Sequence, residues 1–227
     1  MIRTTKSAKS EGGTWNKKLE PGNHKVKIVS VKYNPVNIRG YENAVNLIYV
    51  LESEPVGGDF QGFQIDKDDP SKGDHEGRVS WVKANSFPFY TGRTKNGKPR
   101  DTVSSVLASI KGMCLSLGCM DWWKSVDGKY ETVEDFVKAF NDDAPYEDKW
   151  LYVCIQGTQY KKRDSNYLEW DLSFPYGIDG RYPYSSADGD LSKVVEFDSD
   201  VHAIKLPSQE TNDNSDSDSG SDFDIDL

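Results

Sequence analysis

The chain has 227 residues, of which 36% are hydrophobic and 12% aromatic, enough for one sizeable core or two small domains. No apolar run approaches the roughly 18 residues of a membrane-spanning helix, so we expect no membrane partner. The formal net charge is −9, but residues 207–227 hold seven acids and no Lys or Arg, and the rest of the chain is nearly balanced. The acidic composition therefore does not exclude an anionic ligand.

The chain begins with a basic segment. Residues 1–40 hold nine Lys and Arg side chains against two acids. Residues 1–14 are polar and contain Gly, which predicts a mobile basic arm ahead of a domain at 15–206 and a tail at 207–227. The three cysteines are an odd number and no secretory signal is recognisable, so we expect reduced thiols and a cytoplasmic protein, in the host cytoplasm if the chain is viral.

The first half of the chain is predicted to form strands at 22–33, 44–52, 60–65 and 78–83, with 87–91 extending the sheet. In the first strand, alternation places Ser30 on the same face as Val26, and Val31 on the opposite face. Asn34-Pro35 is expected to end this strand. Residues 66–77 and 93–100 are predicted to be loops, and the second has four basic residues and no acid.

Helices are predicted in the middle of the chain. Asp101 stands as the N-cap of a helix whose apolar residues recur at 3–4 spacing up to Leu117, and Gly118 occupies the place of a C-terminal glycine. Thr132 and Asp135 resemble a capping box in front of a second apolar stripe. We assign to core packing both stripes and four tryptophans, Trp15, Trp122, Trp123 and Trp150.

Strands return at 150–156 and 167–174, on either side of a basic hairpin loop at 159–166, and residues 175–206 are irregular. The order of strands, helices and strands is that of a five-stranded OB barrel, in which the helix lies between strands three and four. We therefore predict a mainly β fold with inserted helices, an OB-like five-stranded barrel with extended loops. A generic α+β sheet is the alternative.

The tail at 207–227 cannot bury enough apolar surface to offset its ordering entropy, so we expect it to be disordered. Its end alternates acidic and large apolar residues, and this pattern is typical of a docking peptide for a protein partner. The predicted docking residues are Asp222, Phe223, Asp224, Ile225, Asp226 and Leu227. A simple solvating tail is the alternative, but it would gain nothing from three apolar residues at its tip.

Aromatic residues recur beside Lys and Arg along the predicted strands and loops. Such mixtures suit single-stranded nucleic acid, because bases stack on aromatic side chains and cations follow the phosphates. The predicted contacts are Lys25, Lys27, Lys32, Tyr33, Arg39, Tyr41, Arg78, Trp81, Lys83, Phe89, Tyr90, Arg93, Lys95, Lys98, Arg100, Tyr160, Lys161, Lys162, Arg163 and Tyr167. Each group alone is a weak signal, since many such aromatics belong to a core.

The OB-like order and the acidic tail ending Asp-Phe-Asp-Ile-Asp-Leu resemble bacteriophage-type single-stranded-DNA-binding proteins. The resemblance implies non-catalytic, largely sequence-independent binding of single-stranded DNA in replication, recombination and repair, without a cofactor. It also implies that the tail recruits replication and recombination proteins and competes with DNA for the groove. The ending differs from the Pro-Phe common in bacterial members. Whether the chain forms a homo-oligomer is left open.

Two other functions compete with DNA binding. A protein–protein adaptor would use its aromatic surface and tail on protein partners, and its binding would resist salt. A metal-dependent nuclease would need converging carboxylates, whereas the acids here fall mostly in predicted loops and the tail. Residues 66–74 resemble a calcium loop but have Pro70 and Ser71 where a ligand and glycine belong, and no Cys/His pair completes a zinc site.

Overall fold

The computed structural model describes residues 17–57, 60, 75–94, 96–163 and 167–206. Its first strands are β1 (Gly22–Pro35), β2 (Glu42–Ser53), β3 (Val79–Lys83), β4 (Phe89–Arg93) and β5 (Pro99–Arg100). The helices α1 (Thr102–Leu117), α2 (Met120–Val126) and α3 (Val133–Asp142) follow. The chain then forms β6 (Trp150–Lys161), β7 (Leu168–Ser173), β8 (Tyr184–Ser186), a 3-10 turn (Leu191–Lys193), α4 (Ser199–His202) and β9 (Ala203–Ile204).

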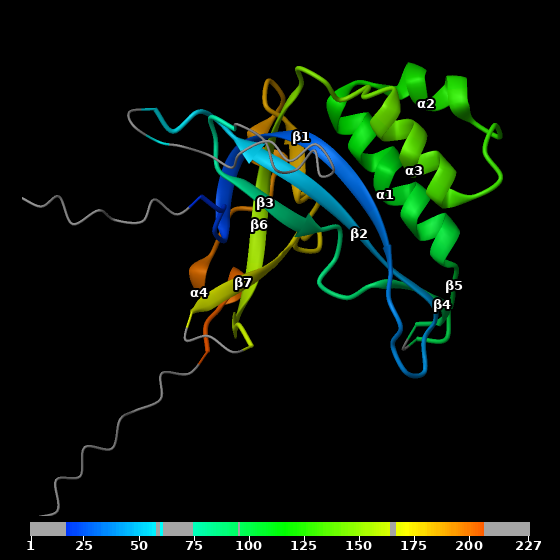
Figure 1. Cartoon of the computed structure of the whole chain (residues 1–227), viewed down its shortest axis with the longest axis horizontal. Helices are drawn as coiled ribbons and strands as arrows, with labels where there is room; N and C mark the ends of the chain where they lie inside the picture. Colours follow the sequence, from blue (N-terminus) through cyan, green and yellow to red (C-terminus); the bar gives the residue numbers. More distant parts are fainter. Residues whose placement is uncertain (1–16, 58–59, 61–74, 95, 164–166, 207–227) are drawn as a thin grey trace, which may run out of the picture.

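Five of these strands form a closed ring of pairings. Around the ring, β1 pairs with β2, β2 with β3, β3 with β7, β7 with β6, and β6 with β1. The β3–β7 pairing is parallel, and the other four are antiparallel. The sheet is therefore mixed, and the fold is mainly β with helices inserted between β3 and β6, as predicted (Figure 1).

The alternation predicted for the first strand is wrong in its second half. The pairing of β1 with β2 shifts between Ile28 and Ser30, which leaves Val29 as an extra residue in the ladder. A bulge of this kind reverses the faces that follow it. Val31 therefore joins Val26 in the core, and Ser30 lies on the outer face. Local periodicity could not reveal the bulge because it depends on the partner strand.

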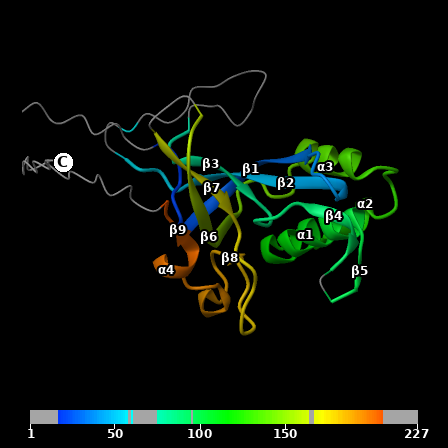
Figure 2. The same ribbon diagram turned by 90° about the horizontal axis from the view of Figure 1, so that it is seen from below.

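The main hydrophobic core lies between the inner faces of the strands and the three helices. It contains Tyr49 and Leu151 from the sheet, Ile110 from α1 and Phe140 from α3, all fully buried. Figures 1 and 2 show α1, α2 and α3 gathered on one side of the sheet. Trp122 and Trp123 are half-buried against this core, in agreement with the packing role predicted for them.

The predicted helix ends are confirmed. The side chain of Asp101 accepts from Ser104 N, and Gly118 ends α1 with φ 66°, a left-handed conformation that favours glycine. The side chain of Thr132 accepts from Asp135 N at the start of α3. The short helix α2 between them was not predicted.

Two segments predicted to be loops or irregular are partly ordered into strands. The ends of the predicted loop at 93–100 belong to an antiparallel pair of β4 and β5, in which Gly92 pairs with Arg100 and Arg93 with Pro99. Residues 175–206 contribute β8 and β9, which both pair with β6. These additions are too short for a periodic signal, and their pairing partners lie far away in the sequence. The strand predicted at 60–65 lies outside the described residues except for Phe60, which is not in a strand.

Candidate nucleic-acid interface

Three aromatic side chains from two separate segments meet beside the turn of the β1–β2 hairpin. The ring centroid of Tyr41 lies 5.1 Å from that of Phe87 and 4.8 Å from that of Tyr90, all in edge-to-face contact. Tyr41 and Phe87 are each 40% exposed. We call Tyr41, Phe87 and Tyr90 the aromatic cluster; it is partly exposed to solvent.

Turn chemistry positions this cluster. Tyr41 N donates to Ile38 O at 3.0 Å, and Gly40 has φ 86°, so the Arg39-Gly40 corner projects outward. A second turn joins β4 to β5, where Gly97 has φ 75°. Both Figures 1 and 2 show β4 and β5 beside the end of the β1–β2 hairpin.

Cations occur on the same turns and strands as the aromatic cluster. The Arg100 guanidinium lies 5.4 Å from the ring centroid of Tyr90, a cation–π contact. Arg39, Lys98 and Arg100 are exposed, and none of the three forms an ion pair with another described residue. Arg93 donates to Gly97 O at 3.1 Å and so stabilises the hairpin. This end of the sheet therefore combines aromatic side chains with cations that have no ion-pair partner among the described residues.

The outer face of β1, β2 and β3 carries a second set of predicted residues. Cross-strand pairing aligns Lys32 with Ile48, and Ile48 with Lys83. The Lys32 ammonium lies 5.8 Å from the ring centroid of Trp81. Lys83 Nζ is 2.6 Å from Asp171 Oδ2 on β7, so its charge is compensated within the protein.

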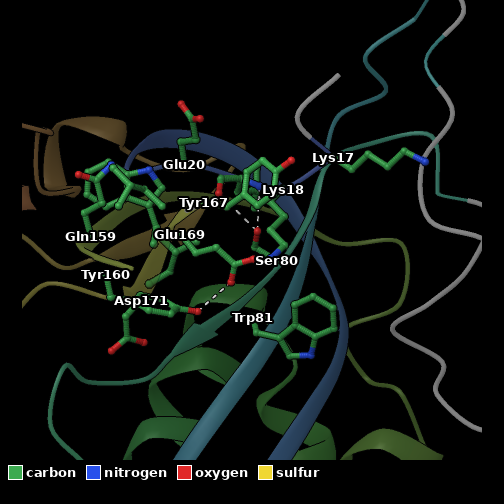
Figure 3. Close-up of a pocket in the computed structure, with 14 residues that line it drawn as sticks. Lys17, Lys18, Glu20, Ser80, Trp81, Gln159, Tyr160, Tyr167, Glu169 and Asp171 are labelled. Atoms are coloured by element: carbon green, nitrogen blue, oxygen red, sulfur yellow. Dashed lines mark hydrogen bonds and ion pairs between the residues drawn. The ribbon is translucent and has the colours of Figure 1, made fainter. Parts of the chain in front are cut away.

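An open groove of about 850 Å³ continues from this face toward the turn between β6 and β7. β3 and β7 pair at two positions near their C-terminal ends, Val82 with Leu172 and Lys83 with Ser173. Toward their N-terminal ends the two strands diverge. Residues 17–20 enter this opening, where Val79 N donates to Lys17 O at 3.0 Å. We call this opening the β3–β7 groove; its lining side chains include Lys18, Trp81, Tyr160, Tyr167 and Glu169 (Figure 3).

Glu169 neutralises much of the charge in the β3–β7 groove. Its carboxylate lies 3.1 Å from Lys18 Nζ and 3.8 Å from Lys162 Nζ, and it accepts from Tyr160 OH at 2.8 Å. The Tyr160 hydrogen bond and then the Lys18 ammonium hold the pKa of this carboxyl below its usual range, against the effect of burial. The same hydrogen bond raises the pKa of Tyr160. At neutral pH the groove thus holds an ionised carboxylate among its cations.

The turn between β6 and β7 carries the last predicted group. Lys161 and Arg163 are exposed and form no ion pair with another described residue. Tyr167 is 78% exposed, and Tyr160 42%. In Figures 1 and 2 the ends of β6 and β7 that adjoin this turn lie at the opposite end of the sheet from β4 and β5. The outer sheet face lies between the two groups.

Other predicted contacts lie apart from these three groups. Lys25 Nζ is 2.8 Å from Glu54 Oε1, and Lys27 Nζ is 3.2 Å from the buried Glu52 carboxylate, at the other end of β1. Arg78 precedes β3, and its backbone N donates to Ser53 Oγ at 2.9 Å.

Two predicted aromatics pack against the core. Tyr33 and Phe89 are half-buried and contact the main hydrophobic cluster. Lys95 and the six docking residues Asp222, Phe223, Asp224, Ile225, Asp226 and Leu227 lie outside the described residues.

Sequence reasoning missed two residues that the structure brings to the interface. Phe87 precedes β4 and belongs to the aromatic cluster, but it was not among the predicted contacts, although it stands beside Phe89 and Tyr90 in the sequence. Glu169 lies in the strand predicted at 167–174 and was not among the predicted contacts. Its alternation with Asp171 did indicate a polar face, but the contact with Lys18 spans 151 positions and has no local signal.

No group of three or more His, Cys, Asp or Glu side chains within the described ranges could hold a metal ion. The three cysteines are buried free thiols. No helix in the part of the chain described is long and apolar enough to cross a membrane. Compared with known protein families, curated proteins and solved structures, the chain shows no match in any of the three.

Proposed function

We propose that this protein binds single-stranded DNA without catalysis and with little sequence preference, in replication, recombination or repair. The observation that carries the proposal is the convergence of the aromatic cluster with Arg39, Lys98 and Arg100, which have no ion pair with another described residue. Exposed π-faces bind unpaired bases, and uncompensated cations bind the backbone phosphates. A base in a duplex would have to unstack to reach the same rings.

The connectivity of the five-strand ring supports an OB-like fold. The ring follows the order β1-β2-β3-β7-β6, and the helices stand between its third and fourth strands along the chain. In OB folds, the face of strands two and three and the loops 1–2 and 4–5 bind oligonucleotides. The corresponding parts here are β2 with β3, residues 36–41 and residues 162–167, which carry the basic and aromatic groups described above.

The distribution of ion pairs suggests a path for the strand. Ion pairs with other described residues are absent for Arg39, Lys98 and Arg100 near the aromatic cluster, and for Lys161 and Arg163 at the β6–β7 turn. By contrast, Lys83 on the outer sheet face is paired with Asp171, and Lys162 in the β6–β7 turn is paired with Glu169. A strand would therefore gain most from phosphate contacts at the two ends and from stacking on Trp81 between them.

The test is fluorescence anisotropy of a labelled oligo(dT) across a salt series, with duplex DNA as competitor. We expect binding that duplex DNA displaces poorly and that weakens steeply with salt. For about six phosphate contacts, log K should fall by about 4 per tenfold rise in salt, since each contact contributes about 0.7. Binding that is indifferent to salt, or that prefers the duplex, would contradict the proposal.

The tail is proposed to compete with DNA and to recruit replication or recombination proteins. The described chain reaches Leu206, whose N donates to Gln159 Oε1 at 3.3 Å, and Gln159 lines the β3–β7 groove. Leu206, the last residue before the acidic segment 207–227, therefore lies beside a groove that Lys17 and Lys18 line.

Deletion of residues 207–227 should tighten oligo(dT) binding at low salt by about fivefold, because it removes a covalently tethered competitor. The gain should disappear at about 0.5 M salt, where tail and protein are screened from each other. A tail of equal length with its acids replaced by Asn and Gln is the control, and it should behave like the deletion. Equal affinity of all three proteins at every salt concentration would exclude competition.

A protein–protein adaptor is the second candidate, and one observation favours it. Tyr176, Ile178 and Tyr182 are more than 60% exposed around the turn that the Ile178–Arg181 bridge closes. Exposed apolar residues grouped on one turn are typical of a protein contact. Retention of a protein partner by the full chain, without any salt-sensitive binding of oligo(dT), would favour this function over DNA binding.

A further inference from the structure

The Glu169 carboxylate stands where two ammonium groups and a phenol converge. Oε1 lies 3.1 Å from Lys18 Nζ and 3.8 Å from Lys162 Nζ, while Oε2 accepts from Tyr160 OH at 2.8 Å. The side chain is only 25% exposed, although it lines an open groove. These donors come from three places in the chain: the segment before β1, the end of β6 and the β6–β7 turn. Figure 3 shows the carboxylate between Tyr160 and Lys18.

The same donors suit a phosphate. Lys ammonium groups and a Tyr hydroxyl are the usual partners of backbone phosphate oxygens in protein–DNA complexes. The β3–β7 groove also offers Trp81 and the exposed ring of Tyr167 for bases. A strand entering the groove would therefore meet a carboxylate already bound to the groups that its phosphate needs.

A second acid repeats the arrangement. Asp171 is two residues from Glu169 on β7, so the two side chains point to the same side of the strand. Its carboxylate holds Lys83 at 2.6 Å, and it also lines the groove. Two cation–carboxylate pairs thus follow one strand along the groove.

We propose that Glu169 is an internal counter-anion of the DNA-binding groove, which an incoming strand must displace from Lys18 and Lys162. The residue thereby limits the affinity of the groove and sets its salt dependence. This inference rests on the proposed function. The opposing view is that Glu169 serves DNA binding by orienting Lys18 and Tyr160; its removal would then weaken binding, whereas removal of a competitor strengthens it.

The test compares Glu169→Gln with Glu196→Gln in the full-length protein. Gln at 169 can still accept from Tyr160 OH, so the variant removes the charge and keeps the hydrogen bond. Glu196 faces Arg181 at 3.9 Å, is 86% exposed and does not line the groove, so its replacement changes the net charge equally. Each protein is titrated with two probes, labelled oligo(dT) and inorganic polyphosphate.

We expect Glu169→Gln to bind oligo(dT) about tenfold more tightly than the wild type at about 50 mM salt. Each ammonium group that then contacts a phosphate should steepen the salt dependence by about 0.7, so for two such contacts the advantage should shrink to about 1.5-fold at about 200 mM. Glu196→Gln should change the affinity by less than about twofold. Polyphosphate should show the same order of affinities, because it presents the same phosphate chemistry.

The outcomes separate the two proposals. If the wild type binds no oligo(dT) but Glu169→Gln gains affinity for polyphosphate, the role of Glu169 stands and the DNA-binding function fails. If the wild type binds oligo(dT) but Glu169→Gln binds neither probe more tightly than Glu196→Gln does, the DNA-binding function stands and the counter-anion role of Glu169 is overturned. Weaker binding by Glu169→Gln overturns it as well, in favour of an orienting role.

Discussion

Replacement of Arg39, Lys98 and Arg100 together with Gln should lower the affinity for oligo(dT) about 30-fold at about 50 mM salt, which corresponds to roughly 2 kcal/mol. Arg100 contacts the aromatic cluster, Arg39 and Lys98 lie on the neighbouring turns, and none of the three is paired with a carboxylate of the described residues. The slope of log K against log salt should become shallower by about 2, since each phosphate contact contributes about 0.7. Anisotropy titrations at several salt concentrations measure both quantities.

The matched control replaces Lys124, Lys129 and Lys138 with Gln. All three are exposed: Lys124 lies on α2, Lys129 in the turn after it, and Lys138 on α3. Their replacement changes the net charge by the same amount. We expect their replacement to change affinity by less than about threefold, through the long-range field alone. If the two triple variants lose the same affinity, the cations at the aromatic cluster have no special role. Circular dichroism of both variants should match the wild type, because the replaced side chains are exposed.

Replacement of Glu52 with Ala should lower the free energy of unfolding by about 3 kcal/mol, because each buried donor left without its acceptor costs roughly 1–3 kcal/mol. The Glu52 side chain is only 5% exposed, and its carboxylate lies 2.9 Å from His75 Nδ1 and 3.2 Å from Lys27 Nζ. It also accepts from Gly77 N at 3.1 Å. Ala would leave this buried backbone donor and the His75 ring without their acceptor. Urea denaturation measures the change.

Glu54 provides the control for this effect. It pairs with Lys25 at 2.8 Å but its side chain is 56% exposed, so Glu54→Ala should cost less than about 1 kcal/mol. Equal destabilisation by the two variants would contradict the importance assigned to burial.

The Glu52 site should also make stability depend on pH. Burial alone would raise the pKa of Glu52, but the hydrogen bonds from His75, Gly77 N and Lys27 outweigh it and lower the pKa below the ordinary value. A carboxyl whose folded-state pKa is depressed stabilises the fold above its unfolded-state pKa and loses this contribution as pH falls through the folded-state pKa. The difference in stability between wild type and Glu52→Ala should therefore be constant at neutral pH and shrink in acid.

The elements with strong local signals could be predicted from the sequence. Asp101, Gly118 and Thr132 were identified as helix ends because capping depends on residues within one turn. The order of strands and helices followed from periodicity, which reports the direction of each side chain relative to its neighbours. Exceptions arose where a distant strand determined the outcome, as in the bulge at Val29 and the short strands β8 and β9.

The candidate site was predictable only as a set of residue types. The sequence by itself determined that aromatic and basic residues accompany one another, that the start is basic and that the tail is acidic with an apolar tip. It did not indicate which cations are compensated, because Lys83–Asp171 and Lys18–Glu169 join positions 88 and 151 residues apart.

Only the tertiary structure decided which predicted residues share a surface. It brought Tyr41, Phe87 and Tyr90 together from two separate segments and placed Tyr33 and Phe89 against the core. It also placed the Glu169 carboxylate in the lining of the groove, beside Tyr160. The physical reason is that side-chain direction is set locally by the backbone repeat, whereas neighbours across a sheet are set by strand register. Register depends on bulges, turns and the packing of the whole core.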